Sequence, residues 1–229
     1  MFRKLLKVLR GDTLLDRAYK RSFEMLDITY GMFAKSRSSL MKTETGAPDL
    51  DINALDIQVN EYEREVRRNV HDHLTTFGTE DIYAGLVLIS IIIDIERIGD
   101  YTKNIMELAM NHTAKLQEGR YARDLKRIEE AVEDSFERTR SIFEKSDADD
   151  AKKLLEEYYW INPLCDKIAI SYIREEDNTI PGKDAVTLAL YFRFLKRINS
   201  HLRNIATSVV NPFDKIGFVP KDIRKKLES

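Results

Sequence analysis

The side chains of this sequence best suited to chemistry are acidic. Glu96 and Asp100 stand four positions apart, a spacing that places both on one face of a helix. Carboxylate oxygens bind hard cations and iron, so the pair forms half of a metal site. The alternative is an ordinary solvated helix face, and the spacing alone permits both interpretations.

A second polar strip lies about forty residues earlier in the chain. Asp56, Asn60 and Glu63 recur at helical spacing beside an apolar stripe. If the two helices are antiparallel neighbours, this strip faces Glu96 and Asp100 across a shallow groove with four carboxylates and one amide. The donors do not identify the ion, which could be iron, zinc, magnesium or a similar divalent or trivalent metal.

Motifs of other chemistries are missing from the sequence. It contains no GxxxxGK[ST], GxGxxG, HExxH or GxSxG motif, and no ExxH pair of the ferritin-like di-iron type. The single cysteine, Cys165, excludes a disulfide framework and a CxxC zinc site. We therefore predict that the protein is not an enzyme, with a carboxylate-metal enzyme as the alternative from a different class.

The composition favours long helices over turns. The chain has 229 residues, with only nine glycines and five prolines, and 33% of its residues are charged. A net charge of −2 provides no overall basic field, so we predict no nucleic-acid partner. The most apolar run, 82–93, is shorter than the roughly 20 residues of a membrane span. These features predict a soluble, cytoplasmic protein.

Helical periodicity and breakers divide the chain into six helices and an all-α fold. A loop is expected at 43–49, Pro163 is expected to kink the fifth helix, and a loop with a basic tail is expected at 211–229. The six helices are expected at about 12–42, 50–76, 79–115, 124–145, 149–174 and 183–210.

A repeat relates the third and sixth helices. ERIGDYTKNI at 96–105 and KRINSHLRNI at 196–205 share Arg, Ile, Asn and Ile at an offset of 100. Three-helix halves are too thin to bury both faces of their helices, so we predict that two of them pack together as a duplicated bundle. The predicted halves are 1–115 and 116–210, followed by the tail.

The stretch DIERIGDYTKN at 94–104, preceded by DIQVNEYE about forty residues earlier, resembles the PhoU family of bacterial phosphate-signalling and phosphate-transport regulators. The resemblance covers most of the chain as two repeats. It implies two tandem three-helix bundles and metal ions bound at the surface by E(D)xxxD motifs on paired helices.

The family's metal motif carries over to the first half of this chain. Glu96 and Asp100 match the motif of the third helix, and Asp56 and Glu63 match acidic positions on the second. Asn60 stands where the family often has Asp or Asn. The resemblance therefore implies a metal site formed by these five residues.

The second half departs from the motif. Its Lys196 stands where the first half has Glu96, and a protonated lysine repels a cation, so we expect the second site to be lost. The other replacements are Ser200 for Asp100, Tyr158 for Asp56, and Cys165 for Glu63, whereas Asn162 keeps the asparagine of Asn60.

Three further polar residues are not expected to take part in metal binding or catalysis. Arg97 is interpreted as a cross-helix ion pair. His112, near a helix end, is expected to be solvated, and His201 is expected to be a surface or half-buried side chain rather than a metal ligand.

The resemblance implies a regulator that docks on a phosphate transporter, a sensor histidine kinase or both. A closely related alternative is an accessory protein of a Pit-type or sodium–phosphate permease. The first ten residues are predicted to form a basic amphipathic turn. Such a turn could contact the inner face of the membrane, but the simpler expectation is that it docks on the bundle. The sequence leaves open whether the chain forms homo-oligomers.

Overall fold

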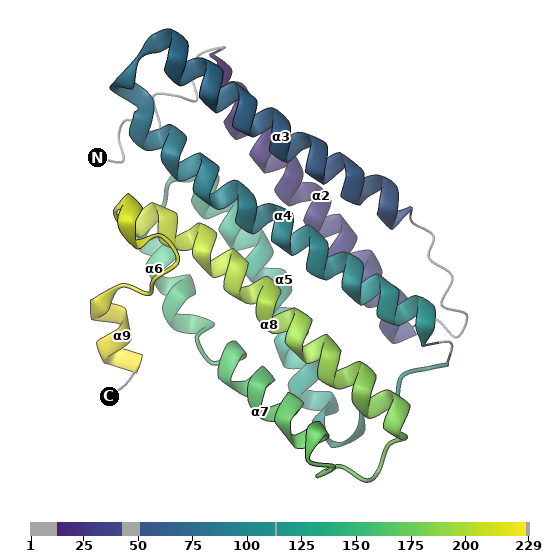
Figure 1. Cartoon of the computed structure of the whole chain (residues 1–229). Helices are drawn as coiled ribbons and strands as arrows, with labels where there is room; N and C mark the ends of the chain where they lie inside the picture. Colours follow the sequence, from purple (N-terminus) through teal and green to yellow (C-terminus); the bar gives the residue numbers. More distant parts are fainter. Residues whose placement is uncertain (1–12, 43–50, 113, 228–229) are drawn as a thin grey trace.

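Helices form the regular structure of the chain (Figure 1). The structure, a computed structural model, describes residues 13–42, 51–112 and 114–227, and no strand occurs among them. The predicted all-α fold is confirmed, whereas the predicted N-terminal turn at 1–10 and loop at 43–49 lie outside the described residues. Within the described ranges no helix is long and apolar enough to cross a membrane.

The first repeat consists of α2 (Leu14–Lys42), α3 (Ile52–Phe77) and α4 (Ile82–Asn111). Asp51 caps α3 by accepting a hydrogen bond from the backbone N–H of Ala54. Gly78, with φ of 80°, ends α3, because a positive φ interrupts the helix and suits glycine. A 3₁₀ turn then reverses the chain into α4, so α3 and α4 are antiparallel neighbours.

The second repeat consists of α5 (Ala122–Lys145), α6 (Ala148–Glu157), α7 (Ile161–Ile173) and α8 (Gly182–Val210). The prediction of one kinked helix at 149–174 is wrong, since α6 and α7 are separate helices. Pro163 lies in the first turn of α7, where its missing N–H is tolerated. In a continuous helix its ring would clash with the carbonyl of Tyr159, so the chain breaks there.

The tail adds one more helix to the second repeat. Where the sequence predicts a loop and a basic tail, the short helix α9 (Lys221–Leu227) packs against α6 (Figure 1). Ile223 is buried in that contact, whereas Phe218 stays exposed.

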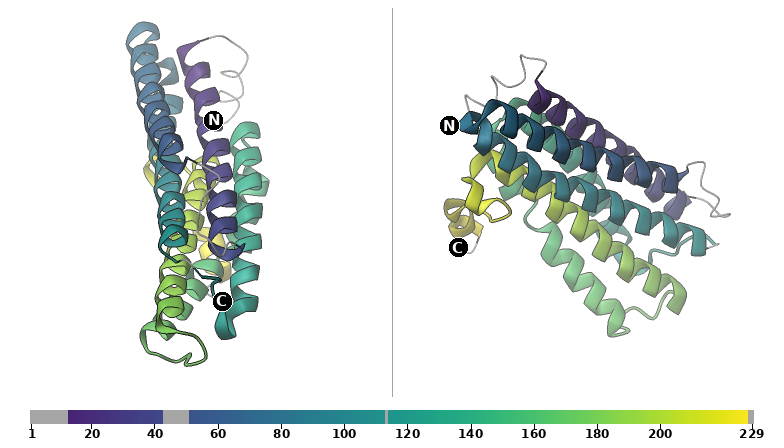
Figure 2. Two further views of the ribbon diagram at one scale, coloured as in Figure 1. Left: turned by 90° about the vertical axis from the view of Figure 1, so that its right-hand side faces the viewer. Right: turned by 45° about the horizontal axis from the view of Figure 1, so that its top comes forward.

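The helices form two layers (Figures 1 and 2). In one layer α3, α4, α8 and α7 lie side by side, and α2 and α5 lie behind them. The pattern of buried and exposed positions in 91–100 of α4 recurs position for position in 191–200 of α8. Residues 100 positions apart in the sequence therefore occupy equivalent places in α4 and α8.

Polar side chains fix α4 against α8 where the repeats meet. Asp94 accepts a hydrogen bond of 2.9 Å from Asn204 and lies 2.7 Å from Nδ1 of His201. Tyr101 stacks on the His201 ring and accepts a hydrogen bond of 3.1 Å from Arg197. His201 is half-buried, as expected, and serves the junction between the repeats.

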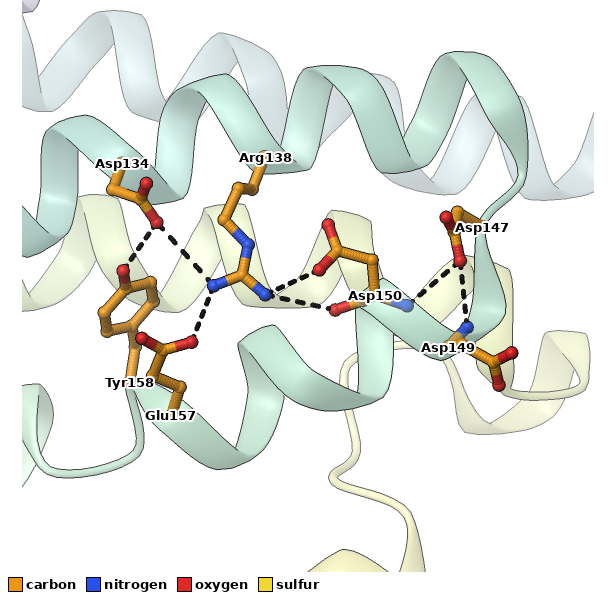
Figure 3. A network of polar contacts seen from close by, with 7 residues as sticks. All are labelled: Asp134, Arg138, Asp147, Asp149, Asp150, Glu157 and Tyr158. Atoms are coloured by element: carbon orange, nitrogen blue, oxygen red, sulfur yellow. Dashed lines mark hydrogen bonds and ion pairs between the residues drawn. The ribbon is translucent and has the colours of Figure 1, made fainter.

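Arg138 of α5 binds α6 through several carboxylates (Figure 3). Its guanidinium lies 2.7 Å from Asp150 and 2.7 Å from Glu157, and 3.7 Å from Asp134 on its own helix. Tyr158 donates a hydrogen bond to Asp134 and closes the network. The network holds α6 against α5.

We expect Arg138→Met to lower the free energy of unfolding by about 1–2 kcal/mol, because two charge-assisted hydrogen bonds between helices are lost. Chemical denaturation at neutral pH measures the change. The matched control is Lys126→Met on the same helix, whose ion pair with Glu130 is long and exposed. We expect about 0.5 kcal/mol or less for this control. Equal effects of the two substitutions would contradict the structural role given to Arg138.

Candidate functional site

The five residues of the predicted metal site gather along the seam between α3 and α4. Glu96 lies close enough to Asp100, Glu63 and Asp56 for each to act on it electrostatically. Asn60, half-buried on α3, belongs to the same strip. We call this set of five residues the acidic strip.

Burial and neighbouring charges make ionisation of Glu96 unfavourable. Its side chain is 17% exposed. Burial raises the pKa of Glu96 most, and the negative charge of Asp100 raises it further. Arg97 opposes this effect, while Glu63 and Asp56 add to it, so the pKa stays above its ordinary value.

Basic side chains of the same two helices bind the α3 carboxylates of the acidic strip. Lys103 of α4 reaches across to Asp56, with 2.9 Å between Nζ and Oδ2, and this contact raises the pKa of Lys103. Arg67 binds Glu63 at 2.7 Å along α3. Sequence reasoning missed Lys103, although its position three residues after Asp100 places it on the same side of α4.

Arg97 binds within its own helix. Its guanidinium lies 2.9 Å from Asp100 and 3.5 Å from Glu96. The predicted cross-helix ion pair is wrong, because a carboxylate three residues away already satisfies the guanidinium. The ion pair between α4 and α3 is formed by Lys103 instead.

The oxygen donors of the acidic strip are of the kind that hard cations bind. In this structure, however, the side chains are not arranged as ligands around one point. Among the residues that the structure describes, no three His, Cys, Asp or Glu side chains converge as ligands around one point. Asp56, Glu63 and Asp100 each lie within 3 Å of a lysine or arginine nitrogen. A cation would therefore compete with Lys103, Arg67 and Arg97 for these carboxylates.

The corresponding seam of the second repeat has a neutral amide–hydroxyl network where the first repeat has acidic side chains, with Lys196 beside it. Asn162 donates a hydrogen bond of 2.9 Å to Ser200 and accepts one of 3.0 Å from Asn199. Lys196 lies 2.5 Å from Asp166. These contacts replace mutually repelling carboxylates with amide and hydroxyl groups that bind one another directly.

Tyr158 and Cys165, which replace Asp56 and Glu63, do not belong to this amide–hydroxyl network. Tyr158 binds Asp134 in the α5–α6 network, as described above. Cys165 is fully buried, and its burial raises the pKa of the thiol to about 12. A buried neutral thiol is a poor metal ligand and a poor nucleophile.

A buried histidine–carboxylate pair also escaped sequence reasoning. His112, at the end of α4, binds Asp184 in the first turn of α8 through Nε2 and the carbonyl of Ala114 through Nδ1. The expectation that His112 is solvated is wrong. No local signal indicates this pair, because its members lie 72 positions apart and meet only when the repeats pack.

We expect Glu96→Gln to raise the free energy of unfolding at pH 7, because the variant keeps the side chain but removes a disfavoured charge. Between the ordinary pKa of 4.5 and the raised pKa of the folded state, the folded state holds a proton that the unfolded state has released, so stability falls as pH rises through this window. The gain should therefore disappear at about pH 4. Denaturation of metal-free protein at both pH values tests this. Glu61→Gln, at an exposed position of α3, is the control and should change stability by about 0.5 kcal/mol or less.

Two solved structures share this fold. The structure of PhoU from Pseudomonas aeruginosa matches 86% of this chain and 95% of its own, with a TM-score of 0.73 and 18% identity. The phosphate transport system regulatory protein PhoU from Streptococcus pneumoniae matches 86% of this chain and 93% of its own, with a TM-score of 0.70 and 15% identity. No curated protein sequence matches the chain.

The family assignment comes from the sequence of both repeats. The PhoU domain model matches residues 23–109 and again residues 125–209. The first match covers the acidic strip and the second covers the corresponding seam of α7 and α8. Together the matches span most of the chain, and the resemblance seen in the sequence is confirmed: the chain belongs to the PhoU family.

Proposed function

We propose that this protein regulates phosphate uptake and phosphate signalling by contact with other proteins and without catalysis. Its partners are a phosphate transporter, a sensor histidine kinase or both, and it acts in the cytoplasm at the inner face of the membrane. The single observation that carries the proposal is the pair of PhoU domains spanning most of the chain. The Streptococcus pneumoniae protein of this fold is named a phosphate transport system regulatory protein.

The geometry supports a docking function. Four helices, α3, α4, α8 and α7, lie side by side in one layer and offer a broad surface to a partner. All four helices carry both charged side chains and exposed aliphatic side chains. A surface with both features suits recognition of another protein.

Deleting the gene in its own organism tests this function. We expect the deletion to raise phosphate uptake, or to switch on a phosphate-starvation reporter, in medium rich in phosphate. The intact chain supplied in trans should restore the normal response. The transporter and the kinase of the same organism should also co-purify with the tagged protein. Unchanged uptake and an unchanged reporter in the deletion strain would contradict the proposal.

We also propose that the acidic strip holds a metal ion. Glu96, Asp100 and Asp56 would bind it, with Asn60 and Glu63 beside them, and a bound cation would offset the repulsion among these carboxylates. Support comes from the electrostatic coupling of Glu96 to the other three acids. Lys103 and Arg97 lower the affinity, since they bind the same oxygens.

Elemental analysis of purified protein tests the metal proposal. We expect metal in the wild type, loss of it in Glu96→Gln/Asp100→Asn, and a higher content in Lys103→Met, which removes a competing cation. Asp166→Asn, in the second repeat, is the control and should match the wild type. Equal metal content in all four proteins would contradict the metal site without affecting the proposed regulatory function.

A further inference from the structure

An apolar groove runs between α7 and α8. It encloses about 520 Å³. Its lining, apart from charged residues, consists of Ala169, Ala185, Ala189, Ile170, Ile173, Val186, Leu190 and Tyr172.

The walls of the groove consist of exposed aliphatic side chains. Ile173 is 77% exposed, Val186 62%, Ile170 46% and Leu190 41%. Single exposed apolar residues are common, whereas these four lie together along one groove.

The first repeat shows that the fold does not require this apolar wall. At the offset of 102 that relates α3 to α7, Ile170 corresponds to Arg68 and Ile173 to His71. In addition, α3 contacts both α2 and α4, whereas α7 packs chiefly against α8. On α8 the wall is partly shared, since Val186 corresponds to Leu86, which is also exposed. The α7 wall therefore arises from residues particular to the second repeat and from a helix with one side left open (Figure 1).

The rim of the groove carries an excess of positive charge. Asp166 lies 3.2 Å from Arg193 and 2.5 Å from Lys196, so two cations share one carboxylate. Arg193 is itself 57% exposed and lines the groove. An acidic group on a partner would balance the remaining positive charge of Arg193 and Lys196.

The size of the groove fits one helix better than a second folded copy of the chain. Four aliphatic side chains offer an apolar patch on the order of a few hundred Å². Each side of a standard protein interface contributes about 800 Å². A single amphipathic helix laid along a groove needs only a row of anchors on one face.

We propose that this groove binds an amphipathic helix of a partner protein, with an apolar stripe flanked by acidic residues. This proposal rests on the proposed function: the groove is the surface through which the protein would contact a regulatory partner. The apolar stripe would cover Ile173 and Val186, and the acidic flank would lie beside Arg193.

Synthetic peptides test the groove with the full-length protein. The probe is a fluorescein-labelled helical peptide of about 18 residues, with leucines on one face and glutamates on both flanks; a second peptide carries lysines on the flanks. Fluorescence anisotropy measures binding. We expect the glutamate peptide to bind saturably and at least about tenfold more tightly than the lysine peptide.

Matched variants locate the binding site. Val186→Glu should weaken binding about tenfold or more. Its control is Leu86→Glu, the position 100 residues earlier in the first repeat, which is also exposed and should leave binding unchanged. Circular dichroism and denaturation verify that both variants fold.

Three results would overturn the inference: no saturable binding of the glutamate peptide, equal binding by wild type and Val186→Glu, or a protein dimer that Val186→Glu dissociates in analytical ultracentrifugation. The last result would assign the groove to a second copy of the chain. Each can occur while deletion of the gene still alters phosphate uptake, so the groove and the proposed function fail separately.

Discussion

The rest of the structure depends on the packing of α4 against α8. One side of each of these helices is buried by its own repeat, and another side is buried by the other repeat. Within its repeat α4 packs against α2 and α3, and α8 packs against α5, α6 and α7. Asp94, His201 and Asn204 fix the contact between them with hydrogen bonds. Neither repeat could cover its long helix alone, so duplication and stability are linked.

The two repeats share a core and differ in the polar residues that face outward. Positions 91–100 and 191–200 are buried alike, yet the seam beside the first holds carboxylates bound to lysine and arginine, and the seam beside the second holds a neutral amide–hydroxyl network. Core positions are constrained by packing on several sides. Surface positions are free of that constraint, so charge and apolar surface have diverged between the repeats.

The helices could be predicted from sequence because they depend on local periodicity. The last long helix was expected at about 183–210 and is observed at Gly182–Val210, and the repeat was visible from 96–105 and 196–205. The break between α6 and α7 was underestimated, since a proline in the first turn of a new helix and a proline that kinks an old one look alike in sequence.

Side-chain partners could be predicted less well. The positions of the acidic strip were identified, but the binding of Lys103 to Asp56 depends on how two helices are rotated against each other. The pair of His112 and Asp184 depends on the packing of one repeat against the other. Such contacts follow from tertiary geometry, which a single sequence does not specify locally.

The buried thiol of Cys165 turns the chain into its own conformational reporter. It is the only cysteine, it has no exposed surface, and its raised pKa keeps it protonated and unreactive in the native fold. An alkylating reagent can reach it only when α7 separates from its neighbours. The rate of labelling therefore measures how often the second repeat opens, without any introduced probe.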